Sequence, residues 1–184
     1  MISPVVQCDL CPKNCRISNG QSGECRIRVN LDGRLIATTY AHPCAVHVDP
    51  MEKKPMFHFL PGTKILSLAT VGCNLHCMNC QNWEISQQNP ENVVAEKLEP
   101  EEIAELAKRC GCRSIAYTYT EPIVYYEYTL DSCMKVSEAG LFNVLVTAGY
   151  ANTEPWRRIC RFVAGANIDL KSISDTFYRE VCSA

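Results

Sequence analysis

From residue 64 onward, short apolar runs alternate with longer amphipathic stretches. The apolar runs have the length of buried strands, and the stretches between them repeat apolar residues at the three- and four-residue spacing of a helix. This pattern predicts strands at residues 65–69, 114–118, 141–146 and 166–170. It also predicts helices at 100–109 and 124–139, a third helix that begins at Thr153, and a last one capped by Ser174.

Each helix is expected to have one apolar face. Pro100 opens the helix at 100–109 and Gly111 ends it, because proline suits the first helical turn and glycine the position after the last. The helix at 124–139 is expected to present Leu130, Cys133, Met134 and Ser137 together, and the helix from Thr153 to present Trp156, Ile159, Cys160 and Val163. The tyrosines between residues 117 and 128 are expected to pack against the sheet.

Strands separated by helices in this order form a parallel sheet with right-handed crossovers. The carboxyl ends of parallel strands meet at one edge, and the loops that leave those ends build the site. Polar residues gather in these loops, at 72–83, 119–122, 147–150 and 169–171. The sequence therefore predicts an α/β protein, with four parallel strands, whose functional residues lie at one edge of the sheet.

The first of these loops carries three cysteines, Cys73, Cys77 and Cys80, in the spacing C-x3-C-x2-C. Three thiols this close in sequence can point to one place only if the loop folds around a bound group, and the simplest such group is a metal centre. Zinc prefers four ligands in a closed tetrahedron, and His76, directly beside Cys77, would have difficulty turning inward to supply the fourth. A cubane of four irons held by three thiolates leaves one iron free to bind a substrate or cofactor.

A second group of cysteines lies near the N-terminus, in a region rich in glycine, proline and asparagine. The group has metal-ligand spacing and consists of Cys8, Cys11, Cys15 and Cys25. We expect a second metal site here, which is either structural zinc or an iron–sulfur cluster. The change in pattern near residue 62 predicts two domains, a cysteine-rich metal-binding region at 1–62 and a core at 63–184. Cys44 fits a buried small hydrophobe as well as it fits a ligand.

Composition and charge narrow the class of protein. The chain has 184 residues and a formal net charge of −2, so it offers no broad electrostatic attraction to nucleic acid or to an anionic membrane. It shows neither a signal peptide nor an uncharged run near the ~20 residues of a membrane span. Its 13 cysteines are an odd number without an export signal, which favours metal-bound thiols in a reducing compartment over a disulfide scaffold. We expect a cytoplasmic protein that binds no nucleic acid and no membrane.

The C-x3-C-x2-C loop resembles the signature of the radical S-adenosylmethionine superfamily. The wider context resembles the AmmeMemoRadiSam-system radical enzymes, relatives of the pyruvate formate-lyase-activating enzymes. The resemblance rests on 49–55, His58-Phe59, Pro61-Gly62, 72–74 and 80–83, and it runs from about Cys8 to the last residue. One departure is Asn79, which stands where the superfamily usually has an aromatic residue near the adenine.

The resemblance implies a fold and a set of roles. The fold would be a partial βα barrel of the radical SAM type. Related enzymes have six βα units, so a chain with four predicted strands is expected to be a fragment that lacks the last ones, the alternative being a core that another chain completes. Cys73, Cys77 and Cys80 would be the catalytic ligands of a [4Fe-4S] cluster. The residues expected to bind the cofactor S-adenosylmethionine are Glu121, Thr147, Gly149, Asp169 and Lys171.

Each of the weaker candidates has a structural alternative. Glu121 could cap the N-terminus of the following helix. Thr147 and Gly149 could form a simple strand-to-helix turn. Asp169 and Lys171 alternate along one face and could form a structural salt bridge.

The implied function is reductive cleavage of S-adenosylmethionine to a 5′-deoxyadenosyl radical, which abstracts a hydrogen atom from a substrate. The resemblance to the activating enzymes suggests a protein substrate, such as a glycyl radical enzyme, and an electron donor such as flavodoxin or ferredoxin. Two alternatives remain at this stage. An iron–sulfur electron-transfer protein would hold the Cys73 cluster with four protein ligands, and a zinc-stapled binding module would contain zinc but neither iron nor sulfide.

Overall fold

A computed structural model describes residues 4–184 of the chain. Its largest element is a five-stranded sheet in the order β5-β6-β7-β8-β9. The strands are β5 (Ala45–Pro50), β6 (Lys64–Ala69), β7 (Ser114–Tyr117), β8 (Phe142–Thr147) and β9 (Val163–Ile168). Strands β6 to β9 run parallel, and β5 pairs antiparallel with β6 at the edge of the sheet.

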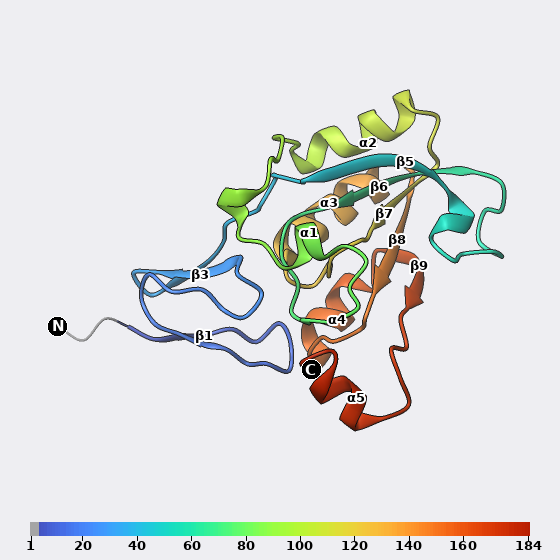
Figure 1. Ribbon diagram of the computed structural model, residues 1–184. Coiled ribbons are helices and arrows are strands. Elements are labelled where there is room, and N and C mark those ends of the chain that lie inside the picture. The colour runs from blue at the N-terminus through green and yellow to red at the C-terminus, as the bar shows by residue number, and fades with distance from the viewer. Residues whose placement is uncertain (1–3) are drawn as a thin grey trace.

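A helix follows each parallel strand. The helices are α2 (Pro100–Arg109), α3 (Tyr126–Glu138), α4 (Thr153–Ile159) and α5 (Asp175–Glu180), with the shorter α1 (Trp83–Ser86), η1 (Met51–Lys53) and η2 (Pro90–Asn92) in the connections. Helix α3 packs against α2, α4 and strand β8. In Figure 1 the helices α2, α3 and α4 follow one another from the top of the view to the bottom, and α5 lies lowest.

The α/β fold and the four parallel strands predicted from the sequence are confirmed. The predicted helix at 100–109 has the bounds of α2, and Ser174 caps α5 by accepting a hydrogen bond from the Phe177 backbone N–H at 3.4 Å. Strand β5 was not predicted. It lies before residue 62, yet it pairs along its whole length with β6, from Ala45 opposite Ala69 to Pro50 opposite Lys64. The two-domain division remains a prediction.

The remaining N-terminal segment forms two small hairpins, which Figure 1 shows to one side of the sheet. Strand β1 (Val6–Gln7) pairs with β2 (Arg16–Ile17), and β3 (Arg28–Leu31) pairs with β4 (Arg34–Ala37). Asn152, at the start of α4, donates hydrogen bonds from its side chain to the backbone oxygens of Asp9, at 2.8 Å, and Cys11, at 3.1 Å. The hairpins are therefore fastened to the core of the molecule.

The predicted apolar faces of two helices were partly wrong. Met134 is 39% exposed, because α3 buries the neighbouring positions instead; they are Tyr126, Tyr128, Thr129, Ser132, Cys133 and Val136. Helix α4 ends at Ile159, so Cys160 is its exposed C-cap and Val163 is the first residue of β9 rather than part of the helix. The tyrosines largely pack as expected, since Tyr117, Tyr125 and Tyr128 are fully buried.

Candidate functional site

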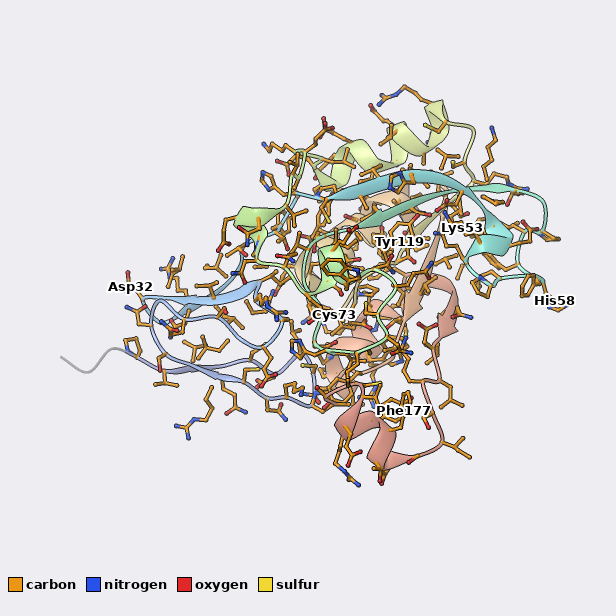
Figure 2. The ribbon with its side chains drawn as sticks, viewed as in Figure 1. Asp32, Lys53, His58, Cys73, Tyr119 and Phe177 are labelled. Atoms are coloured by element: carbon orange, nitrogen blue, oxygen red, sulfur yellow. The ribbon has the colours of Figure 1, made fainter. Side chains whose placement is uncertain are left out.

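A cavity of about 460 Å³ opens where the parallel strands end. Its walls come from the Cys73 loop and the end of α1, from the segments that follow β7 and β9, from the end of β8, and from the end of η1 with the residues after it. The residues that line it are Lys53, Lys54, Pro55, Cys73, Leu75, Cys77, Cys80, Gln81, Asn82, Ser86, Thr118, Tyr119, Thr120, Glu121, Val146, Thr147, Ala148, Asp169 and Lys171. Figure 2 labels Cys73, Tyr119 and Lys53, which come from three of these segments. The polar loops that the sequence placed at one edge thus surround one space.

The loop that carries Cys73, Cys77 and Cys80 is fastened at several points. The Gly72 backbone N–H donates to the Ile85 oxygen at 3.0 Å. The Cys73 thiol accepts the Leu75 backbone N–H at 3.4 Å, and the Cys80 sulfur lies 3.2 Å from the Ser86 hydroxyl. These contacts hold the loop in place while all three thiols line the cavity.

The C-terminal segment also supports this loop. The backbone N–H groups of His76 and Met78 donate to the oxygens of Cys182 and Val181, each at 2.9 Å. Burial, together with the neighbouring Cys182 thiol, raises the pKa of Cys77 to about 11. Cys182 is completely buried and does not line the cavity, so it supports Cys77 from behind.

The three thiols border a space with room for a group larger than a single ion, and thiolates are the usual ligands of iron–sulfur clusters, so the donor set fits such a cluster. His76 is engaged elsewhere, because its Nδ1 lies 2.6 Å from the Gln87 Oε1 atom. Burial, reinforced by the Glu121 carboxylate, raises the pKa of Cys73, so binding a cluster would displace a proton from this thiol.

Glu121, Thr147 and Gly149 meet in one hydrogen-bonded group. The Glu121 carboxylate is 1% exposed and accepts the Thr147 hydroxyl at 2.6 Å and the Ala148 backbone N–H at 2.9 Å. Burial raises the pKa of Glu121, although these hydrogen bonds oppose the shift. The Thr147 oxygen in turn accepts the Gly149 backbone N–H at 2.9 Å. Glu121 and Thr147 line the cavity, whereas Gly149 stands behind it.

Asp169 and Lys171 form a salt bridge, which the sequence analysis gave as the structural alternative to cofactor binding. The Lys171 ammonium donates to Asp169 Oδ2 at 2.9 Å, and the side chains are 41% and 31% exposed for Asp169 and Lys171. Although burial opposes it, this contact raises the pKa of Lys171. Both residues also line the cavity, so the ion pair lies where it can contact a bound molecule.

A second polar group around Asp49 was not predicted. The Asp49 carboxylate is 5% exposed and accepts hydrogen bonds from four side chains. The donors are Lys53 at 2.8 Å, Lys54 at 2.7 Å, Ser67 at 2.8 Å and Tyr119 at 2.6 Å. Although burial opposes them, these donors hold the pKa of Asp49 well below its usual range. Burial lowers the pKa of Lys54, whose ammonium lies 4.4 Å from the centre of the Tyr119 ring.

The Asp49 group shapes one wall of the cavity, because Lys53, Lys54 and Tyr119 all line it. Tyr119 has a φ of +64°, which is strained for a residue with a side chain. Its backbone oxygen accepts a hydrogen bond from the Asn82 side chain at 2.9 Å. The segment 49–55 is part of the family resemblance, but the resemblance implied no function for its individual residues.

The N-terminal cysteines Cys8, Cys11, Cys15 and Cys25 line a separate, small pocket next to the Cys73 loop. Cys44 lies elsewhere: its thiol is 3.6 Å from the Ala69 oxygen. No helix among residues 4–184 has the length and apolar character needed to cross a membrane. The structure therefore gathers the predicted ligands into two groups and leaves Cys44 apart.

Comparisons with known proteins agree with this arrangement. A family model described as the Radical SAM superfamily matches residues 67–183. An uncharacterized protein of Methanocaldococcus jannaschii, MJ0808, is 46% identical over 179 residues, which are 97% of this chain and 53% of that protein. The chain thus spans about half the length of this curated relative. The crystal structure of QueE from Escherichia coli has a similar fold, with a TM-score of 0.52, 12% identity, and coverage of 72% of this chain and 61% of that one.

Proposed function

The chain belongs to the radical SAM superfamily, whose model covers 67–183, and from this premise we propose that it is the catalytic part of an enzyme that cleaves S-adenosylmethionine reductively. Superfamily membership implies a 4Fe-4S cluster and S-adenosylmethionine. We assign the cluster to Cys73, Cys77 and Cys80, and the cofactor to the cavity that these residues border. The observation that supports the proposal is that three thiols, a buried carboxylate and an ion pair all face one space of about 460 Å³.

The cluster, when bound, supplies the electron that breaks the sulfonium bond of S-adenosylmethionine and leaves methionine and a 5′-deoxyadenosyl radical. The residues of this chain would bind and orient the cofactor in the cavity and exclude water. Cys73, Cys77 and Cys80 would hold the cluster, and three thiolates are one fewer than a fully ligated four-iron cluster needs.

Two groups are suited to hold the methionine end of the cofactor. The buried Glu121 carboxylate has acceptor capacity beyond the hydrogen bonds it already receives, so it can take an N–H of the methionine amino group. Lys171 can neutralise the methionine carboxylate, with Asp169 limiting how far its ammonium moves. Thr147 positions Glu121 through the 2.6 Å hydrogen bond between their side chains. These assignments would orient the cofactor without any movement of the sheet.

For the substrate we propose a molecule whose hydrogen atom is abstracted at this cavity, with a glycyl radical protein as one class. The support is indirect: the segment 49–55 resembles the AmmeMemoRadiSam-system enzymes, which are relatives of the activating enzymes, and Lys53, Lys54 and Pro55 of that segment line the cavity. The reductant would be a one-electron carrier such as flavodoxin or ferredoxin. In the reducing compartment that the cysteine content suggests, such a carrier could reach the cluster.

One observation favours a second candidate, an electron-transfer protein with a fully ligated cluster. Cys182 is a fourth thiol, and it lies next to Cys77. It could complete the ligand set if it turned toward the cavity. Its complete burial, outside the residues that line the cavity, argues for the enzyme.

Spectroscopy of the anaerobically reconstituted protein separates the two candidates. With an open iron, S-adenosylmethionine should change the electron paramagnetic resonance spectrum of the reduced cluster, and Cys182→Ser should leave this change in place. If the spectrum responds to the cofactor only in the Cys182→Ser variant, Cys182 is the fourth ligand. Zinc in place of iron and sulfide would indicate a metal staple without catalysis.

The activity is tested with the full-length protein that contains this chain. Dithionite and S-adenosylmethionine should give 5′-deoxyadenosine, and Cys73→Ala should abolish it. Cys160→Ala, which removes an exposed thiol far from the loop in sequence, is the matched control and should retain it. Absence of 5′-deoxyadenosine from protein with a complete cluster would contradict the proposed function.

A further inference from the structure

The side chains around Asp49 lie between the cavity and a small apolar cluster on the same face of the sheet. Val146 lines the cavity, and Val144, two residues earlier on the same face of β8, is completely buried. The apolar cluster consists of Met51, Ile65, Ala116 and Val144. Above it, Asp49 binds Lys53, Lys54 and Tyr119, all of which line the cavity. We call these four residues, Asp49, Lys53, Lys54 and Tyr119, the floor of the cavity.

The floor carries two ammonium groups and a single carboxylate. Asp49 Oδ1 accepts Lys53 at 2.8 Å, and Asp49 Oδ2 accepts Lys54 at 2.7 Å. With both lysines protonated, one formal positive charge is left over. Apolar side chains of similar size are often as stabilising as a buried ion pair. Stability therefore does not account for placing these charges on top of an apolar cluster.

The two lysines differ in their freedom to contact a bound molecule. The Lys54 side chain is 2% exposed, and its ammonium lies 4.4 Å from the centre of the Tyr119 ring. The Lys53 side chain is 58% exposed, and an ion pair this exposed is weak. Within residues 4–184 the Lys53 ammonium makes one hydrogen bond, to Asp49, although an ammonium has three N–H groups. Lys53 thus has donors to spare for a ligand, and Lys54 is fixed behind it.

The other charged groups along the cavity have partners under the proposed function, on which this step rests. Glu121 and the pair of Asp169 with Lys171 are assigned there to the methionine end of S-adenosylmethionine. Asp49 belongs to β5 and Asp169 follows β9, and these strands are the two opposite edges of the five-stranded sheet. The floor is therefore the charged part of the cavity that remains for the substrate.

We propose that the floor binds a carboxylate group of the substrate, with Lys53 as the residue that contacts it. Asp49, Lys54 and Tyr119 are positioning residues that hold the ammonium of Lys53 at the cavity. One carboxylate carries one negative charge and matches the floor, whereas a phosphate group carries about 1.5–2 at neutral pH and exceeds it. The carboxylate belongs to a free organic acid or to an acidic side chain of a protein. It is held by charge and hydrogen bonds, and no bond to Lys53 forms.

The test measures whether a carboxylate shields Lys53. The full chain is treated briefly with an amine-acetylating ester, and the modification of each lysine is followed by mass spectrometry. Lys97 is the matched control, because it is also exposed and also paired, with Glu99 at 2.7 Å. Succinate at about ten times its Kd should slow the acetylation of Lys53 about tenfold by mass action and leave Lys97 unchanged, at constant ionic strength. The uncharged analogue succinamide should protect neither lysine.

Three outcomes of this measurement would overturn the proposal. They are an absence of protection at Lys53 by succinate, equal protection of Lys53 and Lys97, and stronger protection of Lys53 by inorganic phosphate than by succinate. A second probe, a peptide amide with one internal glutamate, identifies the source of the carboxylate. Protection by succinate without the peptide indicates a free organic acid, and protection by both indicates a protein substrate.

Variants assign the contact to Lys53 itself. Succinate should raise the melting temperature of the native chain and of Lys97→Gln, because a ligand that binds only the folded state stabilises it. It should not raise the melting temperature of Lys53→Gln, and Lys53→Arg, which keeps the positive charge, should restore the effect. The same rise in Lys53→Gln as in the native chain would overturn the role of Lys53.

These measurements are separate from the test of the proposed function. S-adenosylmethionine alone should leave Lys53 reactive in the protein reconstituted with its cluster; protection would show that the cofactor occupies the floor and would overturn the proposal. No turnover is needed, so protection by succinate can fail while 5′-deoxyadenosine is still formed. Conversely, protein with a complete cluster that shows protection by succinate but yields no 5′-deoxyadenosine would contradict the proposed function alone.

Discussion

Replacing Asp49 by asparagine should destabilise the protein strongly, because the substitution removes the counter-charge of a buried lysine. Asparagine keeps nearly the same shape, so the packing of β5 against β6 is preserved. The Lys54 side chain, however, is 2% exposed, and its ammonium lies 2.7 Å from Asp49 Oδ2. In the variant this ammonium must stay buried without a partner or lose its proton.

The magnitude follows from the surroundings of the pair. Removing one partner of a buried ion pair costs about 3–5 kcal/mol. The Tyr119 ring, 4.4 Å from the Lys54 ammonium, offers a cation–π contact worth only about 0.5–2 kcal/mol, and this contact is already present in the native protein. The second ion pair of Asp49, with Lys53, adds about 0–1 kcal/mol because the Lys53 side chain is 58% exposed. We therefore expect a loss of about 3–5 kcal/mol in the free energy of unfolding.

The assay is urea denaturation of the cluster-free protein under reducing, anaerobic conditions, followed by far-ultraviolet circular dichroism. Glu138→Gln is the matched control, since it breaks the exposed pair with Lys135 and should cost less than about 1 kcal/mol. The double variant Asp49→Asn/Lys54→Met should be more stable than Asp49→Asn alone, because it contains no unpaired buried charge. An Asp49→Asn variant as stable as the control, or a double variant less stable than the single one, would refute the reasoning.

Three further predictions concern the same structure. The pKa of Asp49 is lower in the folded state than its unfolded value near 3.8, so its contribution to stability is complete above that pH and is lost as the pH falls below it. In acid, the free energy of unfolding should therefore fall more steeply with pH for the native protein than for Asp49→Asn. Gly72→Ala should prevent iron incorporation at the Cys73 loop, measured by iron content, while Gly111→Ala, which has a similar positive φ but open space around it, should not. Thr147→Val should cost about 1–3 kcal/mol in urea denaturation and weaken S-adenosylmethionine binding, because Glu121 loses a donor that Thr147→Ser would keep.

The parallel part of the sheet could be predicted from the sequence because its first two strands, β6 and β7, are almost entirely buried and because strands and helices alternate along the chain. Every residue of β7 is buried, and β6 is buried from Ile65 onward. Strand β5 carries no such signal. It is an antiparallel edge strand in which His47, Val48 and Pro50 are exposed, so neither a continuous apolar run nor a regular alternation marks it.

The candidate site likewise has one part that could be predicted from the sequence and one part that could not. Glu121 and Thr147 were predictable, because Glu121 follows β7 and Thr147 is the last residue of β8, so the topology alone brings them to one edge. The contacts of Asp49 depend on the pairing register, which puts His47 opposite Ser67 and Asp49 opposite Ile65. Since β5 itself was not predicted, the sequence analysis could not connect Asp49 with Ser67.

The strained backbone of Tyr119 shows why the side chains around Asp49, which were not predicted, matter to the site. A residue with a side chain at a φ of +64° costs on the order of 1–3 kcal/mol and persists only when its surroundings hold it. Two contacts do so: Asp49 accepts the Tyr119 hydroxyl at 2.6 Å, and Asn82, from the end of the Cys73 loop, donates to the Tyr119 oxygen at 2.9 Å. One contact comes from the edge strand and the other from the cluster loop. Because Tyr119 lies two residues before Glu121, the same two contacts also fix the start of the segment that presents the buried carboxylate to the cavity.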